Sequence, residues 1–410
     1  MKYCSKCLYP INHPLNIIFD KNNICSGCLI HKEKDKLDWV NRFNKLKKIA
    51  KTYRSTKKDK FDCIVPVTGA KDSYFILHIV KNLLKLNPLI VNYNTHYNTE
   101  VGIRNLNYLK SITGSTHFNL TVDPKKVKKI THSTLKQFGN LYWHCIAGQT
   151  VFPVQIACKM NIPLIIWGAH QGIDQVGMYS HLDEVEMTRK YRKEHDLFGY
   201  ESEDLMEATN LKKIDLENYI YPDDKEIYSK GIKGIYLNNY IRWDSKQQHE
   251  LMIKEYKYET QKLARTFDTY NNIDCLHYSN LHDYFKYLKF GYSLINDHCS
   301  REIRLKRITR EQGMYLVQKY RKRKPENVNH FLKWIGFKHS DLNYLYDKFR
   351  NTLIWERIKK NWTCKKEMNV KLSYSDKLKI DRKLNFFPNY RKSNKKFTKE
   401  PILFGKGYDD

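Results

Sequence analysis

FDCIVPVTGAKDS, at residues 61–73, holds the clearest structural pattern in the chain. Its first half is short, apolar and rich in β-branched residues, which predicts a buried strand over 62–67. Its second half is a turn of small residues, and the apolar residues beyond it predict a helix over 73–86. A strand, a tight loop and a helix start in succession form an anion site, because the N–H groups at the helix start point into the loop.

The loop after the predicted strand carries the groups that phosphate binding needs. Gly69 and Ala70 let the backbone approach a ligand closely. Thr68 and Ser73 add hydroxyl groups, and Lys71 adds a positive charge. The loop is neither a Walker A site nor a dinucleotide fingerprint, because the required lysine and glycine spacings are missing. Taken alone, these six residues would favour an ordinary strand–turn–helix connection, so the surrounding pattern has to decide.

From residue 62 onward the sequence alternates between strand and helix patterns. Further strands are predicted over 88–94, 116–121 and 162–168, and helices over 99–112, 124–138 and 146–160. This alternation predicts an α/β fold with a doubly wound parallel sheet, whose ligands bind beyond the carboxyl ends of the strands. The residues expected at those ends are Thr68–Ser73, Asn92, Asn94, His96, Asp123, Gly168, Ala169 and His170.

Two Cys-x-x-Cys pairs lie near the N-terminus, Cys4 with Cys7 and Cys25 with Cys28. Their separation is typical of a four-cysteine zinc site. An iron–sulfur cluster and a redox pair are the alternatives, but no thioredoxin-like unit surrounds these cysteines. We therefore expect a structural Zn²⁺ with all four positions filled by protein, which stabilises the fold without touching the nucleotide site. The nearby histidines, His13 and His31, are expected at the surface.

The patterns divide the chain into six segments. Residues 169–245 are polar and irregular, with turn signals at Gly231–Gly234, and their place at the ligand edge fits either a substrate-binding segment or a solvated connector. The predicted organisation is a Cys4 zinc module of the zinc-ribbon type at 1–31, a linking helix at 32–60, an α/β domain at 61–180, an irregular substrate segment at 181–245, a helical region at 246–350 and a basic tail at 351–410.

Charge and composition indicate which kinds of partner and which cellular compartment are expected. The net charge of +29 fits a polyanionic partner such as RNA, but the lysines are dispersed and the composition is that of an A- and T-rich coding sequence, so a nucleic acid is not expected. No apolar run is long enough to span a membrane, and the first residues lack the apolar core of a signal peptide. We expect a cytoplasmic protein whose cysteines are thiols or metal ligands.

The loop resembles the Ser-Gly-Gly-x-Asp-Ser loop of the PP-loop ATP-pyrophosphatases, adenine-nucleotide α-hydrolase-like enzymes, with Thr68 and Ala70 as departures. Ala70 would be strained if its position needs a positive φ. Further stretches look like the N-acetyl sugar amidotransferase family, which acts in bacterial surface polysaccharide (lipopolysaccharide, O-antigen) synthesis and flagellin modification with pseudaminic-acid-type sugars. This resemblance covers roughly residues 1–350 and rests on 25–28, 62–67, 97–106, 165–168, 272–275, 282–284, 289–292 and 297–304.

The resemblance implies amidine synthesis from ATP, ammonia and an N-acetyl sugar, with release of AMP and pyrophosphate. ATP and Mg²⁺ would be needed besides the structural Zn²⁺, and Asp72 either caps the helix or helps to hold Mg²⁺. The residues implied are Lys71, Asp72 and Ser73 for catalysis; Thr68, Gly69, Ala70, Lys71, Asp72, Ser73, Asn92, Asn94 and Gly168 for ATP and pyrophosphate; His170, His298, Arg301 and Arg304 for the sugar; and Cys4, Cys7, Cys25 and Cys28 for zinc.

No glutaminase signature is recognisable in the sequence, so ammonia is expected from solution or from a separate glutaminase subunit. Two other hypotheses remain open at this point. A tRNA-modifying PP-loop enzyme, of the thiolation or lysidine type, would suit the charge and the zinc module. A degenerate, non-catalytic PP-loop scaffold would suit the alanine at position 70.

Overall fold

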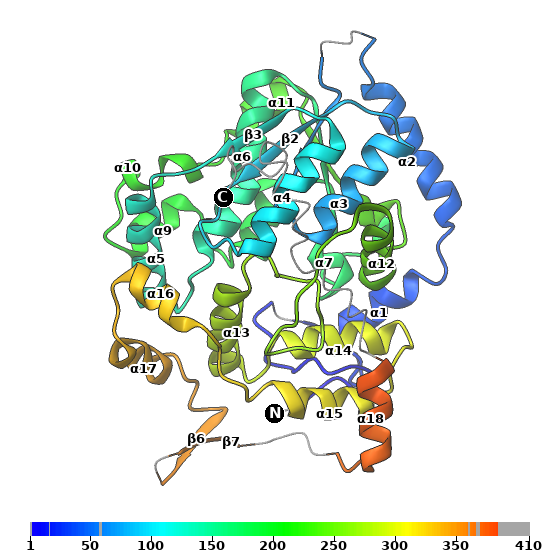
Figure 1. Cartoon of the computed structure of the whole chain (residues 1–410). Helices are drawn as coiled ribbons and strands as arrows, with labels where there is room; N and C mark the ends of the chain where they lie inside the picture. The colour runs from blue at the N-terminus through cyan, green and yellow to red at the C-terminus, as the bar shows by residue number, and fades with distance from the viewer. Residues whose placement is uncertain (1, 16, 57–59, 360, 366–369, 384–410) are drawn as a thin grey trace.

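The computed structural model describes residues 2–15, 17–56, 60–359, 361–365 and 370–383. Residues 384–410 of the predicted basic tail therefore lie outside the described residues. Figure 1 shows a central sheet with helices on both sides, and further helices and a hairpin beside its lower end. Within the described ranges, no helix is long and apolar enough to cross a membrane.

The sheet has five parallel strands in the order β3-β2-β1-β4-β5. Four of them lie inside the predicted strand ranges, which confirms the mixed α/β class with a parallel sheet. From β1 the chain moves through β2 to β3 and then crosses back to β4 and β5 on the other side. The strands are β1 (Cys63–Pro66), β2 (Pro88–Tyr93), β3 (His117–Leu120), β4 (Leu164–Trp167) and β5 (Lys233–Tyr236).

Strand β5 corrects the expectation of irregular structure around Gly231–Gly234. Only Gly231, with φ of +61°, has turn geometry, whereas Gly234 pairs with Ile165 inside the sheet. A β-carbon at Gly234 would lie 2.5 Å from the β-carbon of Met187, so this glycine serves close packing within a strand. A glycine that makes room for a neighbour is indistinguishable in sequence from a glycine that forms a turn.

Successive side chains of the strands point to opposite faces of the sheet and pack into two separate cores. Ile64, Leu89 and Ile165 face α6 (Trp143–Met160) on one side. Val65, Ile90 and Ile166 belong to the larger core on the other side, which they share with side chains from several helices. The sheet is therefore covered on both faces, as in doubly wound folds. The second-face helices are α2 (Trp39–Tyr53), α3 (Lys71–Leu77) with its π-helical continuation (His78–Leu83), α4 (Glu100–Thr113) and α12 (Ser245–Tyr256).

The C-terminal half is helical up to a short antiparallel hairpin. Helix α13 lies in the region predicted as helical and ends at Gly291 with φ of +71°. The hairpin β6–β7 lies in the segment predicted as a basic tail, which gave no strand signal because charged and polar residues interrupt its short strands. The bounds are α13 (Leu276–Phe290), α14 (Leu294–Arg304), α15 (Arg310–Tyr320), α16 (Val328–Ile335), α17 (His339–Lys348), β6 (Trp355–Ile358), β7 (Asn361–Cys364) and α18 (Tyr374–Lys383).

The remaining helices lie in the first half of the chain and in the segment between β4 and β5. This connecting segment contains several short helices, where the sequence indicated irregular structure throughout. They are α1 (Ser26–Glu33), α5 (Pro124–Phe138), α7 (Gln171–Asp174), α8 (Arg189–Tyr191), α9 (Ser202–Ala208), α10 (Lys213–Leu216) and α11 (Asp224–Ser229).

The N-terminal segment packs against α14 and against the residues after α7. The backbone N–H of Leu8 donates to Ser300 Oγ at 3.2 Å, and Asn296 Nδ2 donates to the carbonyl of Leu8 at 3.2 Å. The hydroxyl of Ser26 donates to the carbonyl of Val176 at 2.8 Å. Two segments far apart in the sequence, the N-terminal segment (dark blue in Figure 1) and α14 (yellow), thereby lie side by side.

Candidate functional site

The loop after β1 has the geometry that its sequence requires. Gly69 takes the positive φ, +83°, and a β-carbon there would lie 2.7 Å from that of Leu106. Ala70 has φ of −72° and ψ of 169°, which any residue adopts. The N–H of Thr68 donates to Ser73 Oγ at 3.0 Å, so the two ends of the loop are tied together. The departure from the Gly-Gly pattern at position 70 therefore causes no backbone strain.

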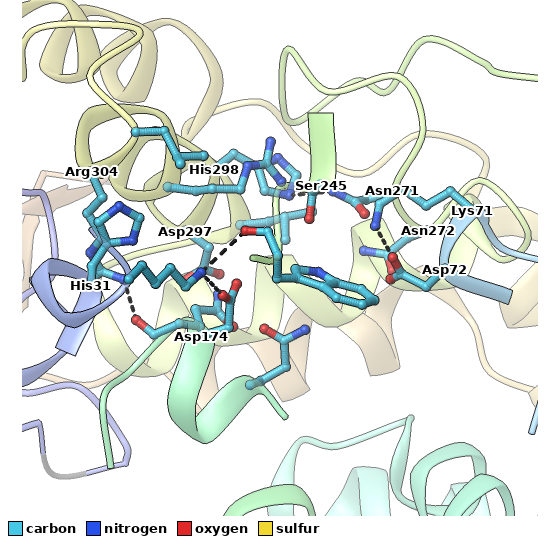
Figure 2. A pocket seen from close by; sticks show the side chains of 17 residues that line it. His31, Lys71, Asp72, Asp174, Ser245, Asn271, Asn272, Asp297, His298 and Arg304 are labelled. Carbon is cyan, nitrogen blue, oxygen red and sulfur yellow. Dashed lines mark hydrogen bonds and ion pairs between the residues drawn. The ribbon is translucent and has the colours of Figure 1, made fainter. Parts of the chain in front are cut away.

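A cavity of about 250 Å³ opens beside the ends of β1 and β4. Between these two strands, the direction in which the chain adds strands to the sheet reverses. In doubly wound sheets, this switch point between strand ends is where ligands bind. Figure 2 shows that its walls come from the loop after β1, from α1, from α7 and from α14. The lining residues are His31, Lys34, Lys71, Asp72, Gln171, Asp174, Gln175, Trp243, Ser245, Asn271, Asn272, Leu294, Asp297, His298, Arg301, Arg304 and Leu305.

Lys71 and Asp72, the first two residues of α3, form one wall of the cavity. Lys71 is buried, and its Nζ forms an ion pair with the carboxylate of Asp72, whose side chain is 41% exposed. The same ammonium lies 5.7 Å from the centre of the Tyr270 ring, which stacks on His249 with 3.9 Å between ring centres. Asp72 therefore pairs with its neighbour in this structure. A buried ammonium at a helix start, held by a more exposed carboxylate, suits exchange of that partner for a phosphate.

Helix α14 supplies His298 and Arg301 to the opposite wall. Burial lowers the pKa of His298 to about 3, so its imidazole is neutral at neutral pH, with Nδ1 2.7 Å from Thr266 Oγ1. Arg301 bonds to Asp268 Oδ2 at 3.2 Å. Burial acts to raise the pKa of Asp268, but Arg301 and the N–H groups of the following turn outweigh it and hold this pKa well below its usual range. Asp268 thus stays charged and fixes Arg301 beside the cavity.

A buried ion pair closes the third wall. Lys34 follows α1 and bonds to Asp174 at the end of α7, and its Nζ also lies 3.4 Å from the carbonyl of Trp243. His31 and His13 are buried as well, which corrects the expectation that both lie at the surface. Burial lowers the pKa of His31 to about 3. Their burial follows from the docking of the N-terminal segment onto α7 and α14, a tertiary contact that local sequence does not encode.

The four cysteines of the N-terminal segment form one buried cluster. Their sulfur atoms all lie within 4.8 Å of one another, and Cys7 and Cys25 are 3.5 Å apart. Tetrahedral coordination by Zn²⁺ places sulfur atoms about 3.8 Å apart, so the arrangement fits a closed Cys4 zinc site. Backbone N–H groups also point at Cys4 Sγ, from Cys7 at 3.4 Å and from Cys25 at 3.3 Å, as suits a thiolate.

Arg304 connects this cysteine cluster to the cavity. Its Nε lies 3.4 Å from Cys28 Sγ, its Nη2 lies 3.6 Å from Cys25 Sγ, and the side chain lines the cavity. The cluster is therefore adjacent to the cavity rather than remote from it. Arg304, implied as a sugar ligand, is already engaged with the sulfurs and with the carbonyl of Gln175.

Several residues implied by the resemblance are not on the cavity lining. Asn92 donates through Nδ2 to the carbonyl of Val67 at 2.8 Å and joins the ends of β1 and β2. Asn94 holds its own turn by accepting from the N–H of His96 at 3.0 Å. Four of the implied residues form the loop itself: Thr68, Gly69, Ala70 and Ser73. Gly168 lies next to Ile76. His170 packs among the rings of Tyr179, Tyr236 and His195.

The structure also adds lining residues that sequence reasoning did not select. Lys34, Asp174 and Trp243 come from three segments that are far apart in the chain, and only their packing brings them together. For Asn272 and Asp297 a signal existed, because both belong to stretches quoted for the family resemblance. Asp174 stands four residues beyond His170, at the strand edge where ligands were expected.

Comparison with known proteins places part of the chain in a biosynthetic context. Residues 264–369 match the C-terminal domain of the WbpG-like lipopolysaccharide biosynthesis proteins. The match contains α14, with His298, Arg301 and Arg304, and it supports a polysaccharide-biosynthesis enzyme family. The chain is also 32% identical over 105 residues to the uncharacterized protein MJ1599 of Methanocaldococcus jannaschii, covering 25% of this chain and 36% of that protein. It thus spans about a third of the length of that relative.

Proposed function

We propose that the protein is an ATP-dependent, AMP-forming amidotransferase that converts the N-acetyl group of a sugar into an acetamidino group for surface-polysaccharide or flagellin-glycan synthesis. The carbonyl oxygen of the N-acetyl group attacks the α-phosphorus of ATP, and pyrophosphate leaves. Ammonia then attacks the activated carbon, and AMP departs with the former carbonyl oxygen. Transfer of that oxygen to AMP makes it a good leaving group, which an amide oxygen is not.

One observation carries this proposal. A single cavity is lined by Lys71 and Asp72 of the phosphate-type loop and by His298, Arg301 and Arg304 of the part that matches a lipopolysaccharide-biosynthesis domain. A nucleotide and a sugar bound from these two sides would meet inside it. Its position at the switch point of the sheet supports the same assignment.

On the nucleotide side, Lys71 would stabilise the charge that develops on the leaving pyrophosphate. Its partner in the structure is Asp72, so a phosphate oxygen that takes the place of Asp72 at Nζ releases a carboxylate at the rim of the cavity. Carboxylate and phosphate oxygens are the ligands that Mg²⁺ takes in nucleotide sites. Asp72 is therefore the residue proposed to hold Mg²⁺, and Ser73 keeps the loop closed through Thr68.

On the sugar side, the charged groups are arranged to bind rather than to transfer protons. The imidazole of His298, with its pKa near 3, is a hydrogen-bonding group at neutral pH and a poor general base. Arg301 keeps its charge through the buried Asp268 and offers donors for the anionic part of a sugar donor. Burial raises the pKa of Asp297, which lowers the cost of keeping this carboxyl beside a phosphate.

Ammonia is proposed to come from a separate glutaminase subunit. Ammonia is a nucleophile, whereas the ammonium ion is not. Delivery from a partner subunit would keep the ammonia from being protonated in bulk water. The extended backbone at Ala70 removes the steric argument for a degenerate loop and so weighs against the scaffold hypothesis. No feature of the described residues favours a tRNA substrate over a sugar.

The test is an assay with ATP, Mg²⁺, ammonium and a panel of free and nucleotide-linked N-acetyl sugars. The expected products are AMP, pyrophosphate and a sugar one mass unit lighter, since oxygen is exchanged for NH. Formation of ADP, or failure of every sugar to elicit AMP while the protein is folded and metal-loaded, would contradict the proposal.

A further inference from the structure

A second, larger cavity of about 780 Å³ lies among α13, α17, the loop before α16 and the β6–β7 hairpin. It shares no lining residue with the first cavity. All of its lining residues, from Tyr284 to Cys364, fall inside the stretch that matches the lipopolysaccharide-biosynthesis domain. Its size is in the range that suits a small organic ligand.

Positive charge predominates on its described lining. Lys322, Lys324, Arg350 and Arg357 face one carboxylate, Asp347. That carboxylate is already engaged, because it accepts from Trp362 Nε1 at 3.0 Å and lies 3.8 Å from Arg350 Nε. The cavity therefore attracts an anion, and guanidinium groups bind phosphate oxygens in a planar, paired geometry.

Aromatic side chains form a braced wall beside these charges. Trp355 donates through Nε1 to the carbonyl of Leu288 at 2.9 Å and meets Tyr287 edge to face, with 4.9 Å between ring centres. The guanidinium of Arg350 lies between two indoles, 5.1 Å from the Trp355 ring and 4.9 Å from the Trp362 ring. The aromatic wall is therefore preorganised, and such faces stack on planar bases and on the apolar faces of sugars.

Beneath the wall, Arg265 is fully buried and pairs with Asp283 at 2.8 Å. Its guanidinium carbon lies 5.2 Å from the Tyr284 ring and 5.9 Å from the Tyr287 ring. Tyr284 also meets Tyr346 with 4.9 Å between ring centres. These contacts fix the positions of Tyr284 and Tyr287, which line the cavity, without a ligand.

We propose that this second cavity binds a ring-bearing phosphate ligand of the sugar-nucleotide class, with the ring against Trp362, the more exposed of the two indoles, and the phosphates against Lys324, Arg350 and Arg357. The shared chemistry is a phosphate joined to a ring that can stack, which a nucleoside diphosphate and a sugar phosphate both offer. This site is additional to the amidation cavity, and the proposal stands whether or not amidation is the reaction.

The test is equilibrium binding to the full-length, metal-loaded protein, measured by calorimetry with three probes: UDP-N-acetylglucosamine, UDP and N-acetylglucosamine 1-phosphate. Saturable binding of at least one probe is expected, and the two smaller probes report whether the base or the sugar fills the aromatic wall. Lys324→Gln and Arg357→Gln, both at exposed positions, should each weaken binding about tenfold by loss of a charged contact. Trp362→Leu should weaken it similarly by loss of stacking.

Lys333→Gln, an exposed lysine on α16 outside the cavity, is the matched control and should leave affinity unchanged. Thermal denaturation of each variant shows that it is folded. Absence of binding by all three probes would overturn the proposal. Binding that is lost in Lys71→Met but retained in Lys324→Gln, Arg357→Gln and Trp362→Leu would also overturn it, because the ligand would then occupy the first cavity. Tighter binding of polyuridylate than of any probe, increasing with its length, would identify an RNA surface instead.

Discussion

Arg304 Nε lies 3.4 Å from Cys28 Sγ, so one guanidinium touches the cysteine cluster and also lines the cavity at the sheet edge. Four thiolates around one Zn²⁺ leave a net negative charge, which a buried arginine offsets. The cysteine cluster, which could hold a metal ion such as zinc, is thereby connected to the candidate active site by a direct contact. The metal is expected to influence the site by fixing this side chain, although all four of its coordination positions belong to protein.

The first prediction concerns the metal. Cys28→Ser should lower zinc content, lower the melting temperature and weaken the thermal protection that Mg²⁺-ATP gives, because Arg304 loses its anionic partner. Metal analysis and denaturation scans with and without Mg²⁺-ATP measure all three. Cys158→Ala, at a buried cysteine of α6 away from the cluster, is the control and should keep its zinc. A zinc-free Cys28→Ser protein that retains full ATP protection would show that the contact has no functional role.

The second prediction separates the two small residues of the loop. Gly69→Ala should destabilise the fold by about 1–3 kcal/mol, because alanine is strained at φ of +83° and its β-carbon would press on Leu106. Ala70→Gly should leave both activity and stability nearly unchanged, since its backbone is extended. Urea unfolding and AMP release measure the pair. If Ala70→Gly raised the rate of AMP formation tenfold or more, the loop of this chain would have to be regarded as impaired.

The third prediction concerns the lysine of the loop. Lys71→Met keeps the aliphatic bulk of a buried side chain but removes its charge, and AMP formation should fall about a hundredfold or more. Lys51→Met on the exposed face of α2 is the matched control and should retain wild-type activity. The loss should be in kcat more than in KM, because the charge acts on the leaving pyrophosphate. A variant altered only in KM would assign Lys71 to ground-state binding.

The fourth prediction concerns pH and stability. The pKa of His298 is about 3 in the folded chain and near its ordinary value of 6.5 when unfolded, so between these values the unfolded chain binds more protons. His298 therefore contributes stability above pH 6.5, which is lost at about 1.4 kcal/mol per pH unit as the pH falls. On acidification from about pH 7 to about pH 5, the wild type should lose more unfolding free energy than His298→Gln. His339→Gln, at an exposed position, should behave as the wild type, and parallel curves for all three proteins would refute the assignment.

Local sequence predicted the elements that have strong local signals. The run from Cys63 to Val67 is β-branched and bounded by turn formers, and it forms the central strand. Strand β5 escaped prediction because Gly234 is present for close packing against Met187, which leaves no local trace. The hairpin at Trp355–Cys364 escaped because charged and polar residues interrupt its strands and leave no apolar run.

The candidate site was predictable only in part, for a similar reason. Lys71 and Asp72 could be placed at a strand end because the parallel sheet fixes where its carboxyl edge lies. The pair of Lys34 and Asp174 joins residues 140 positions apart, and no local pattern announces such a contact. Asn92 was predicted to bind ATP, but its side chain donates to the carbonyl of Val67. A polar residue at a strand end can therefore stabilise the sheet itself, and the sequence does not distinguish this role from ligand binding.

The measurement that tests the central proposal most directly follows one oxygen atom. An N-acetyl sugar substrate carrying a heavy-oxygen label in its acetyl carbonyl is incubated with the protein, ATP, Mg²⁺ and ammonium, and the products are analysed by mass spectrometry. The account predicts that the label appears in AMP and that the sugar product is an unlabelled amidine. Label retained in the sugar, together with unlabelled AMP or with ADP, would contradict adenylation of the acetyl oxygen and with it the proposed function.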